Sequence, residues 1–378
     1  MCWNGLAMLD APPRLDSICR NLLAGHSLDE RIDLAMGDCR IQIRSNSGIL
    51  VDQLRDYFGH CLTGEAMPDI SVVAIEMTPP HLNLDFWDWK RDPGKLGRKD
   101  AVADIPGGRV VRKVRTDMQF LMGETHRLAV GPCLSNPNQI INFTISQYLS
   151  WLLRRGWLLC HAAGVAADGK GLAIAGMSGG GKSTLALNLI SQGLNFVSND
   201  RLLVRLDGSA AHMAGVPKLP RVNPGTLLHN ADLTSILSAE RAHELSDLAP
   251  DKLRTLEEKY DVDISRFYGP GRIEAGASLE AFVILNWNHG DGSTTQIRQV
   301  DLAKRPDLLA AVMKPPGPFH KTPQGWSTQN FGDLAPEPYL AHLSKTPIYE
   351  VCGGANFNRA ATVCLELLSG GQCQGKPT

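Results

Sequence analysis

The residues best suited to chemistry form a glycine-rich run that ends in lysine and serine, Gly176-Met177-Ser178-Gly179-Gly180-Gly181-Lys182-Ser183. This run fits the pattern G-x-x-x-x-G-K-[ST] of a phosphate-binding loop (P-loop). Glycines let successive backbone N–H groups turn towards an anion without a Cβ in the way. The lysine is expected to reach the β- and γ-phosphates of a nucleotide, and the serine hydroxyl to bind Mg²⁺. The run therefore predicts a site for ATP and Mg²⁺.

The elements around this run are those that a P-loop requires. Residues 172–175 are small or apolar and predict a buried strand, and residues 185–190 place apolar side chains at helical spacing. A helix that begins at the loop adds partial positive charge where the phosphates would lie. A glycine-rich turn with a chance lysine is the alternative, and the flanking elements argue against it. The predicted nucleotide-binding residues are Gly176, Met177, Ser178, Gly179, Gly180, Gly181, Lys182, Ser183 and Thr184.

Two further polar positions are predicted to lie near the loop. Asp168-Gly169 is a strong hairpin signal, so His161 is expected on the strand that precedes the loop strand. Asn199-Asp200 follow a predicted buried strand, and ligands of open α/β sheets collect at the carboxyl ends of strands. Asp200 could orient Mg²⁺ or accept a proton from an attacking hydroxyl. The alternatives are a core histidine at 161 and an ordinary strand-end turn at 199–200.

Composition sets limits on the class of protein. The 378 residues contain 38 Lys plus Arg and 39 Asp plus Glu, so no overall charge favours nucleic acid or an acidic membrane. The nine cysteines include no C-x-x-C pair, which argues against a zinc site or a redox pair. The N-terminus lacks the pattern of a secretion signal, and no apolar run is long enough to span a bilayer. The sequence therefore predicts a soluble, cytoplasmic protein.

The chain is predicted to contain two domains. A leader at 1–16 precedes an N-terminal α+β domain at 17–138, a nucleotide-binding domain follows at 139–369, and a polar tail fills 370–378. In the first domain, strands are expected at 40–44, 70–75, 110–115 and 119–122, and a helix at 49–62. The segment 86–94 carries two tryptophans beside a Lys-Arg pair, and a packed hairpin end is favoured over a nucleic-acid surface.

The second domain is expected to alternate helices and strands. A helix is predicted at 140–156, strands at 157–165, 172–175, 279–285 and 347–351, and a final helix at 360–368. Residues 294–300 are expected to pair with the strand at 279–285, and the glycine-containing segment 264–276 to be mobile.

Residues 160–204 resemble the kinase domain of HPr kinase/phosphorylase, and within that family the subgroup called HPr kinase-related (HprK-related) kinase B. The matching features are a His-x-x-Gly-Val strand at His161, the glycine loop, and a polar pair at the expected distance, Asn199-Asp200. The resemblance implies an α/β P-loop kinase domain, with a fold related to phosphoenolpyruvate carboxykinase, preceded by a smaller α+β N-terminal domain. It implies ATP-dependent phosphorylation of a serine hydroxyl, with Mg²⁺ as cofactor.

Carried over by position, His161 matches the family's active-site histidine, Lys182 its phosphate lysine and Ser183 its metal-binding serine. Asn199 and Asp200 stand where the family has two adjacent aspartates, so Asp200 would be the remaining catalytic and metal-binding carboxylate. Asn199 can only hydrogen-bond, since a neutral amide cannot act as a base.

A second departure from the family concerns its downstream glutamate. Between residues 212 and 239 the only acid is Asp232, so the glutamate that binds metal in the family has no counterpart. Lys218 and Arg221 occupy that neighbourhood instead. These departures argue against the reverse phosphorylase reaction and against HPr itself as the substrate.

The sequence supports three functions in order of preference. The first is an ATP-dependent kinase that phosphorylates a hydroxyl of a protein or a small molecule, carried by His161 with Asp200. The second is an ATP-binding sensor or scaffold with weak chemistry, which Asn199 favours. An ATPase of the transport or motor kind ranks last, because no ABC-type signature is present. The expected partners are a nucleotide and a phosphate acceptor, without nucleic acid or membrane, and a homo-oligomer is left open.

Overall fold

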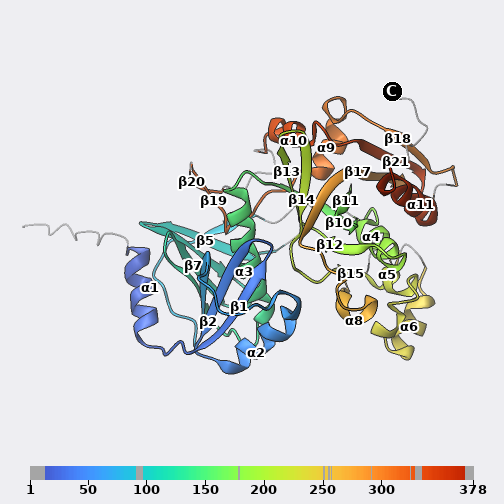
Figure 1. Cartoon of the computed structure of the whole chain (residues 1–378). Helices are drawn as coiled ribbons and strands as arrows, with labels where there is room; N and C mark the ends of the chain where they lie inside the picture. Colours follow the sequence, from blue (N-terminus) through green and yellow to red (C-terminus); the bar gives the residue numbers. More distant parts are fainter. Residues whose placement is uncertain are drawn as a thin grey trace, which may run out of the picture. The chain divides into compact units, whose positions relative to one another are not determined.

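The computed structural model (Figure 1) describes residues 13–90, 97–177, 179–249, 252–253, 256, 258–290, 292–323, 325–327 and 334–370. These residues form two compact units, one within Met1–Ser150 and Pro316–Gln329, the other within Trp151–Pro315 and Asn330–Thr378. Most of the predicted leader and tail, and the predicted nucleotide-binding residue Ser178, lie outside the described residues. Among the described residues, no helix is long and apolar enough to cross a membrane.

The first unit is built on a mixed sheet. Among its described residues, eight strands follow the order β1-β2-β3-β8-β7-β6-β5-β4, with parallel pairing at β2/β3 and β3/β8 and antiparallel pairing elsewhere. The strands are β1 (Glu30–Met36), β2 (Cys39–Ser45), β3 (Ile70–Glu76), β4 (Trp87–Trp89), β5 (Asp100–Ile105), β6 (Gly108–Lys113), β7 (Gln119–Gly123) and β8 (Arg127–Gly131). The helical segments are α1 (Leu15–Ala24), α2 (Gly48–Tyr57), η1 (Gly59–Cys61) and α3 (Pro137–Leu153), and the short strands β19 (Lys321–Thr322) and β20 (Gly325–Trp326) pair with each other.

The strands predicted for this half are confirmed by β2, β3, β6 and β7. The helix predicted at 49–62 is present but ends at Tyr57. Pairing of β4 with β5 agrees with the predicted hairpin, but Trp87 is 41% exposed, so the predicted packing of its end is incomplete. Part of the connection lies outside the described residues. One boundary was wrong: α1 begins at Leu15, inside the predicted leader, because Leu15 and Cys19 are fully buried in the core against the sheet.

Helix α3 belongs mostly to the first unit. The sequence places a domain boundary at 138/139, whereas the compact units divide after Ser150. The reason is packing: the ring of Phe143 on α3 lies 4.8 Å from Phe120 on β7 and 5.4 Å from Phe319. The amphipathic pattern predicted the helix, but not the sheet on which it packs.

The second unit holds a larger mixed sheet. Among its described residues, nine strands include the path β12-β10-β11-β17-β14-β13-β9, and β21 pairs with β17 and β18. Strand β17 runs parallel to both β11 and β21. The strands are β9 (Leu158–Cys160), β10 (Ala162–Ala167), β11 (Lys170–Gly176), β12 (Asn195–Ser198), β13 (Leu202–Asp207), β14 (Ala210–Ala214), β17 (Gly276–Asn288), β18 (Gln296–Gln299) and β21 (Ile348–Gly354).

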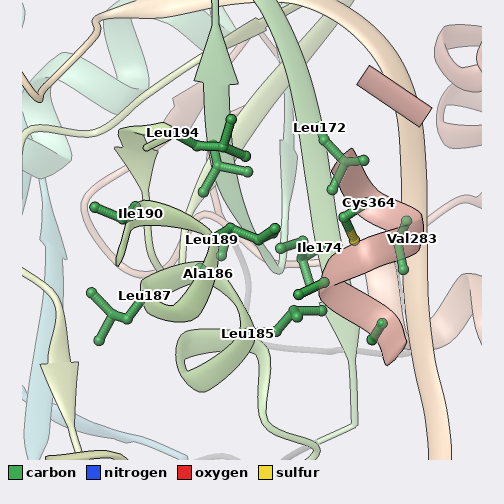
Figure 2. Packing of buried hydrophobic residues seen from close by; sticks show 14 of the residues in the cluster. Leu172, Ile174, Leu185, Ala186, Leu187, Leu189, Ile190, Leu194, Val283 and Cys364 are labelled. Atoms are coloured by element: carbon green, nitrogen blue, oxygen red, sulfur yellow. The ribbon is translucent and has the colours of Figure 1, made fainter. Parts of the chain in front are cut away.

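Helices cover both faces of this sheet. Side chains alternate along β11, so that Leu172 and Ile174 join the core under α4 and α11, whereas Ala173 and Ala175 join the core under α9 and α10. Figure 2 shows Leu185 and Leu189 of α4 beside Ile174, with Cys364 of α11 nearby. The helices are α4 (Lys182–Ser191), α9 (Pro306–Val312), α10 (Pro336–Leu343) and α11 (Phe357–Leu368). Shorter elements are α5 (Pro224–Leu228), α6 (Ala239–Ser246), α8 (Ile264–Tyr268), η2 (Thr234–Ile236), η3 (Leu302–Lys304), and the paired strands β15 (Arg221–Val222) and β16 (Tyr260–Asp261).

The hairpin predicted before the glycine loop is confirmed. Asp168 and Gly169 connect β10 to β11 with φ values of 51° and 74°, and two positive φ values at the central positions define a type I′ turn. This turn fixes the register that pairs Ala162 with Ala175, next to the end of the loop strand. The start of β10 therefore lies beside the glycine loop.

Three expectations for the second half were wrong in detail. The strand predicted at 157–165 is broken at His161 into β9 and β10. Strand β18 pairs with β21, which lies between it and β17. The segment 264–276 is held in place: Arg272 donates hydrogen bonds to the carbonyl of Ile190 in the last turn of α4 and to that of Leu194 in the connection to β12. A guanidinium at a helix C-terminus satisfies carbonyls that have no partner within the helix.

The buried carboxylate of Glu350 on β21 links neighbouring elements of the sheet through hydrogen bonds. Glu350 is 1% exposed and accepts hydrogen bonds from Arg298, Arg305 and Asn286. Burial opposes its ionisation, but these donors outweigh burial and lower the pKa of Glu350 to about 2. Because this folded-state pKa lies below that of the unfolded chain, the stabilisation is complete above the unfolded pKa and is lost as pH falls towards 2.

We expect Glu350→Gln to lower the free energy of unfolding at pH 7 by about 2–4 kcal/mol, because it leaves charged partners without their carboxylate. Urea denaturation at several pH values would measure the difference from wild type. That difference should shrink as pH falls from 5 towards 2, and a difference independent of pH would contradict this account. The exposed Asp301→Asn is the control.

Candidate active site

The glycine loop has the strand–loop–helix setting that its sequence predicted. Strand β11 ends at Gly176, and α4 begins at Lys182 with Gly181 as its N-cap. Gly179 and Gly181 adopt φ values of 77° and 91°, which L residues with a Cβ rarely do. Ser183 and Thr184 lie half-buried in the first turn of α4.

Close packing also requires glycine at both ends of the loop. A Cβ on Gly176 would lie 2.8 Å from the carbonyl oxygen of Leu285 on β17. A Cβ on Gly181 would lie 2.6 Å from the ring of Phe357, the first residue of α11. The indole of Trp287 donates a hydrogen bond of 2.9 Å to the carbonyl of Gly180. The neighbouring strand and helix therefore hold the loop in place.

Lys182 lies over the loop. Its Nζ donates a hydrogen bond of 2.9 Å to the carbonyl of Gly176. Burial lowers the pKa of Lys182 to about 8. The negative charge of Asp200 raises this pKa, whereas the positive charges of Lys314 and Lys259 lower it further. A half-buried ammonium held over glycine backbone is suited to the anionic oxygens of a polyphosphate, which would favour its charged form.

Strand pairing brings His161 and Asp200 together. Leu202 pairs with Cys160, so the turn before β13 lies beside the residue that follows β9. Nε2 of His161 lies 3.3 Å from a carboxylate oxygen of Asp200. Strand β12 is antiparallel to β10, and β10 to β11, so the ends of β12 and β11 share one edge of the sheet. Asn199 is half-buried in the same turn.

Lys314 completes this group, and the sequence did not point to it. Its Nζ lies 3.0 Å from the other carboxylate oxygen of Asp200, although the two residues are 114 positions apart. The backbone places it there: the amide of His161 donates to the carbonyl of Val312, and Met313 bridges to Cys160. The only local signal was a lysine before Pro315, which indicates extended chain but no chemistry.

These neighbours set the charges of the group. Partial loss of hydration opposes ionisation of Asp200, whose side chain is still 57% exposed, but the hydrogen bond with His161 and the charge of Lys314 hold its pKa well below the ordinary value. The hydrogen bond to Asp200 raises the pKa of His161, yet burial and the charges of Lys314 and Lys182 outweigh it, so the net shift is downward. At neutral pH, Asp200 is therefore an anion and His161 is neutral.

Further cations lie around Asp200. Nε of Arg201 lies 4.0 Å from its carboxylate. Lys218 lies within electrostatic range of Asp200 and Arg201, and burial followed by the charge of Arg201 lowers the pKa of Lys218 to about 8. The loop that carries Lys218 is fixed to the end of β12, because the amide of Val216 donates to the hydroxyl of Ser198. Positive charge therefore exceeds negative charge on this flank of the glycine loop.

The residues present fit a nucleoside triphosphate. The loop offers glycine backbone, the N-terminus of α4 and the Lys182 ammonium at one place, which is the chemistry that a polyphosphate requires. No group of three or more His, Cys, Asp or Glu side chains that could hold a metal occurs among the described residues. Mg²⁺ commonly binds through one or two protein oxygens together with substrate phosphates. Ser183 and Asp200 are the residues here that could provide them.

The predicted site residues thus lie along one edge of the second unit's sheet. Lys182 is within electrostatic range of His161, Asp200 and Lys314. Sequence reasoning missed Lys314, as well as Trp287 and Phe357, which pack against the loop. Ser178 cannot be placed, because it lies outside the described residues.

Comparisons with known proteins give matches among solved structures. No protein-family description matches the chain, and no curated protein matches it. Among solved structures, the Hpr(Ser) kinase/phosphatase from Coxiella burnetii is similar over 56% of this chain and 94% of that chain, with 9% identity and a TM-score of 0.27. At this TM-score the similarity does not establish a shared fold.

Proposed function

We propose that this protein is an ATP-dependent kinase that transfers the γ-phosphoryl group of ATP to a hydroxyl of a protein or a small molecule. The observation that carries the proposal is the juxtaposition of the glycine loop and Lys182 with the group formed by His161, Asp200 and Lys314. Phosphoryl transfer depends mainly on positioning and electrostatic stabilisation, and this arrangement offers both. The resemblance of residues 160–204 to HPr kinase/phosphorylase supports the same reaction.

The loop and its helix would hold the phosphates. Backbone N–H groups of residues 179–184 and the Lys182 ammonium would bind the β- and γ-phosphate oxygens. Ser183 and Asp200 would hold Mg²⁺, which when bound neutralises charge on the phosphates. Lys182 is half-buried, so its charge would act on phosphate oxygens with less screening by water than a fully exposed charge.

Asp200 would orient the acceptor. As an anion at neutral pH, its carboxylate can accept a hydrogen bond from the attacking hydroxyl and take its proton late in the transfer. Its low pKa makes it a weak base, so positioning is its larger contribution. Lys314 and neutral His161 hold the carboxylate from both sides, and Asn199 can hydrogen-bond to the acceptor.

A second candidate is an ATP-binding sensor or scaffold with weak transfer. Two observations favour it: Asn199 is neutral where an adjacent acid is expected, and the carboxylate of Asp200 is already contacted by Lys314 and His161. In that case ATP would bind and alter the protein without a phosphorylated product.

Incubation of the full chain with γ-labelled ATP and Mg²⁺ separates the two functions. A cell lysate or the products of neighbouring genes would serve as acceptors. The kinase predicts label on a discrete acceptor at serine or another hydroxyl, and loss of that label with Lys182→Ala. Saturable ATP binding with no transfer to any acceptor would favour the sensor, and no ATP binding would exclude both.

A further inference from the structure

A cavity of about 450 Å³ opens beside the start of α11. Its walls are residues 292–295, which precede β18, together with Gly354, Ala355, Asn356 and Arg359. Its volume is within the range of small-molecule sites, about 300–1,000 Å³, and is larger than a single phosphate group needs. Hydroxyl, amide and guanidinium groups share its lining with apolar atoms. The proposed phosphoryl transfer does not use it.

The topology of the sheet relates this cavity to the glycine loop. Strands β11, β17 and β21 are parallel neighbours in that order, so their carboxyl ends lie at the same edge. The loop follows β11, and the cavity follows β21, two strands or about 10 Å away. His161 and Asp200 lie on the opposite flank of the loop, beside β10 and β12. A triphosphate bound in the loop could therefore point its γ-phosphate towards His161 and Asp200 on one side of the loop. The cavity would lie on the other side.

Aromatic residues connect the loop to the cavity. Phe357, which follows the cavity residue Asn356, contacts Gly181 of the loop. The ring of Trp287 lies 4.8 Å from that of Phe357, and its indole N–H binds Gly180. The glycine loop and one wall of the cavity are therefore parts of one packed structure.

A buried polar atom lies in the same cluster. Nε2 of His289 is buried and has no hydrogen-bond partner among the described residues, and the His289 ring lies 6.3 Å from those of both Trp287 and Phe357. Buried polar atoms in folded proteins nearly always have a partner. His289 does not itself line the cavity, so this atom belongs to the aromatic packing beside the cavity and is not counted among the contacts of a ligand.

We propose that this cavity binds the nucleoside of the nucleotide whose phosphates lie in the glycine loop, with Arg359 and the hydroxyls of Ser293 and Thr294 as polar contacts. The assignment rests on the proposed binding of ATP. It gives the nucleotide a direction along the sheet edge, with the γ-phosphate towards Asp200 and the nucleoside towards α11.

The test compares two ligands that share the polyphosphate. Inorganic tripolyphosphate needs only the loop, whereas ATP needs the loop and the cavity. Dissociation constants of both, with Mg²⁺, would be measured by calorimetry for the full-length wild type, Arg359→Ala and Thr294→Val. The control is Thr362→Ala, an exposed residue of α11 that does not line the cavity. We expect Arg359→Ala to weaken ATP about tenfold or more and tripolyphosphate less than about twofold.

Each other outcome has a distinct meaning. If the wild type binds neither ligand, the proposed function fails, and the nucleoside site with it. If the wild type binds ATP but the cavity variants match the control, the nucleoside site is wrong and the proposed function stands. Equal weakening of both ligands would place Arg359 at the phosphates or in the fold. Unchanged ATP binding with reduced transfer to an acceptor would make the cavity an acceptor site.

Discussion

Lys182→Ala is expected to lower the rate of phosphoryl transfer by about 10²–10³-fold, the usual effect of deleting one preorganised stabilising group. The Lys182 ammonium is half-buried at the start of α4 and already binds loop backbone, so its charge meets the phosphates with little reorganisation. Negative charge on the bridging and transferred oxygens changes during transfer, which makes a fixed cation here more valuable in the transition state than in the ground state. Single-turnover rates with γ-labelled ATP would measure the loss.

The control for this variant is Lys170→Ala. Lys170 is exposed at the hairpin turn, at the opposite end of strand β11 from the glycine loop. The substitution Lys170→Ala therefore removes an equal charge, but far from the loop. Wild-type transfer and ATP affinity in Lys182→Ala would show that the glycine loop is not the nucleotide site. A loss of folding in both lysine variants, read by thermal unfolding, would indicate a general effect of charge rather than a catalytic one.

The glycine loop was readable from sequence because its determinants are local. The positive φ values of Gly179 and Gly181 favour glycine, and the helix that begins at the loop shows apolar spacing; both signals lie close together in the sequence. The Asp168-Gly169 turn is local for the same reason, and it in turn fixes where His161 lies. Residue types at short range thus predicted the strand, loop and helix that form the proposed phosphate-binding part of the site.

The other flank of the site depends on pairing between distant segments. Lys314 reaches Asp200 only because residues 312–313 pair with residues 160–161, and no periodicity in the sequence marks that contact. Likewise, α3 has a recognisable helical pattern, but this pattern does not say which sheet the helix packs against, and the contact of Phe143 with Phe120 could not be predicted from it. The low pKa of Asp200 depends on these long-range contacts, so its charge state could not be predicted from the sequence.

Asp200→Asn is the second change with a large expected effect. We expect transfer to fall by about 10²–10⁴-fold, the range lost with a positioned proton acceptor, while ATP binding stays within a few-fold. The amide keeps the shape of the carboxylate but removes its negative charge, which both orients the acceptor and holds Lys314 and His161. Rates would be measured under saturating ATP, so that a modest change in affinity does not enter.

Two matched variants decide what a loss in Asp200→Asn means. Asp207→Asn removes an exposed carboxylate at the end of β13 and should leave transfer unchanged. Asn199→Asp should be tolerated, because residue 199 lies half-buried in the same turn as Asp200, where the nearby charges of Arg201 and Lys218 would offset a second carboxylate. If Asp200→Asn transfers phosphate at the wild-type rate, Asp200 neither orients the acceptor nor binds an essential metal. With Lys314 and His161 then lacking a catalytic partner, ATP binding without chemistry would be the better account of the site.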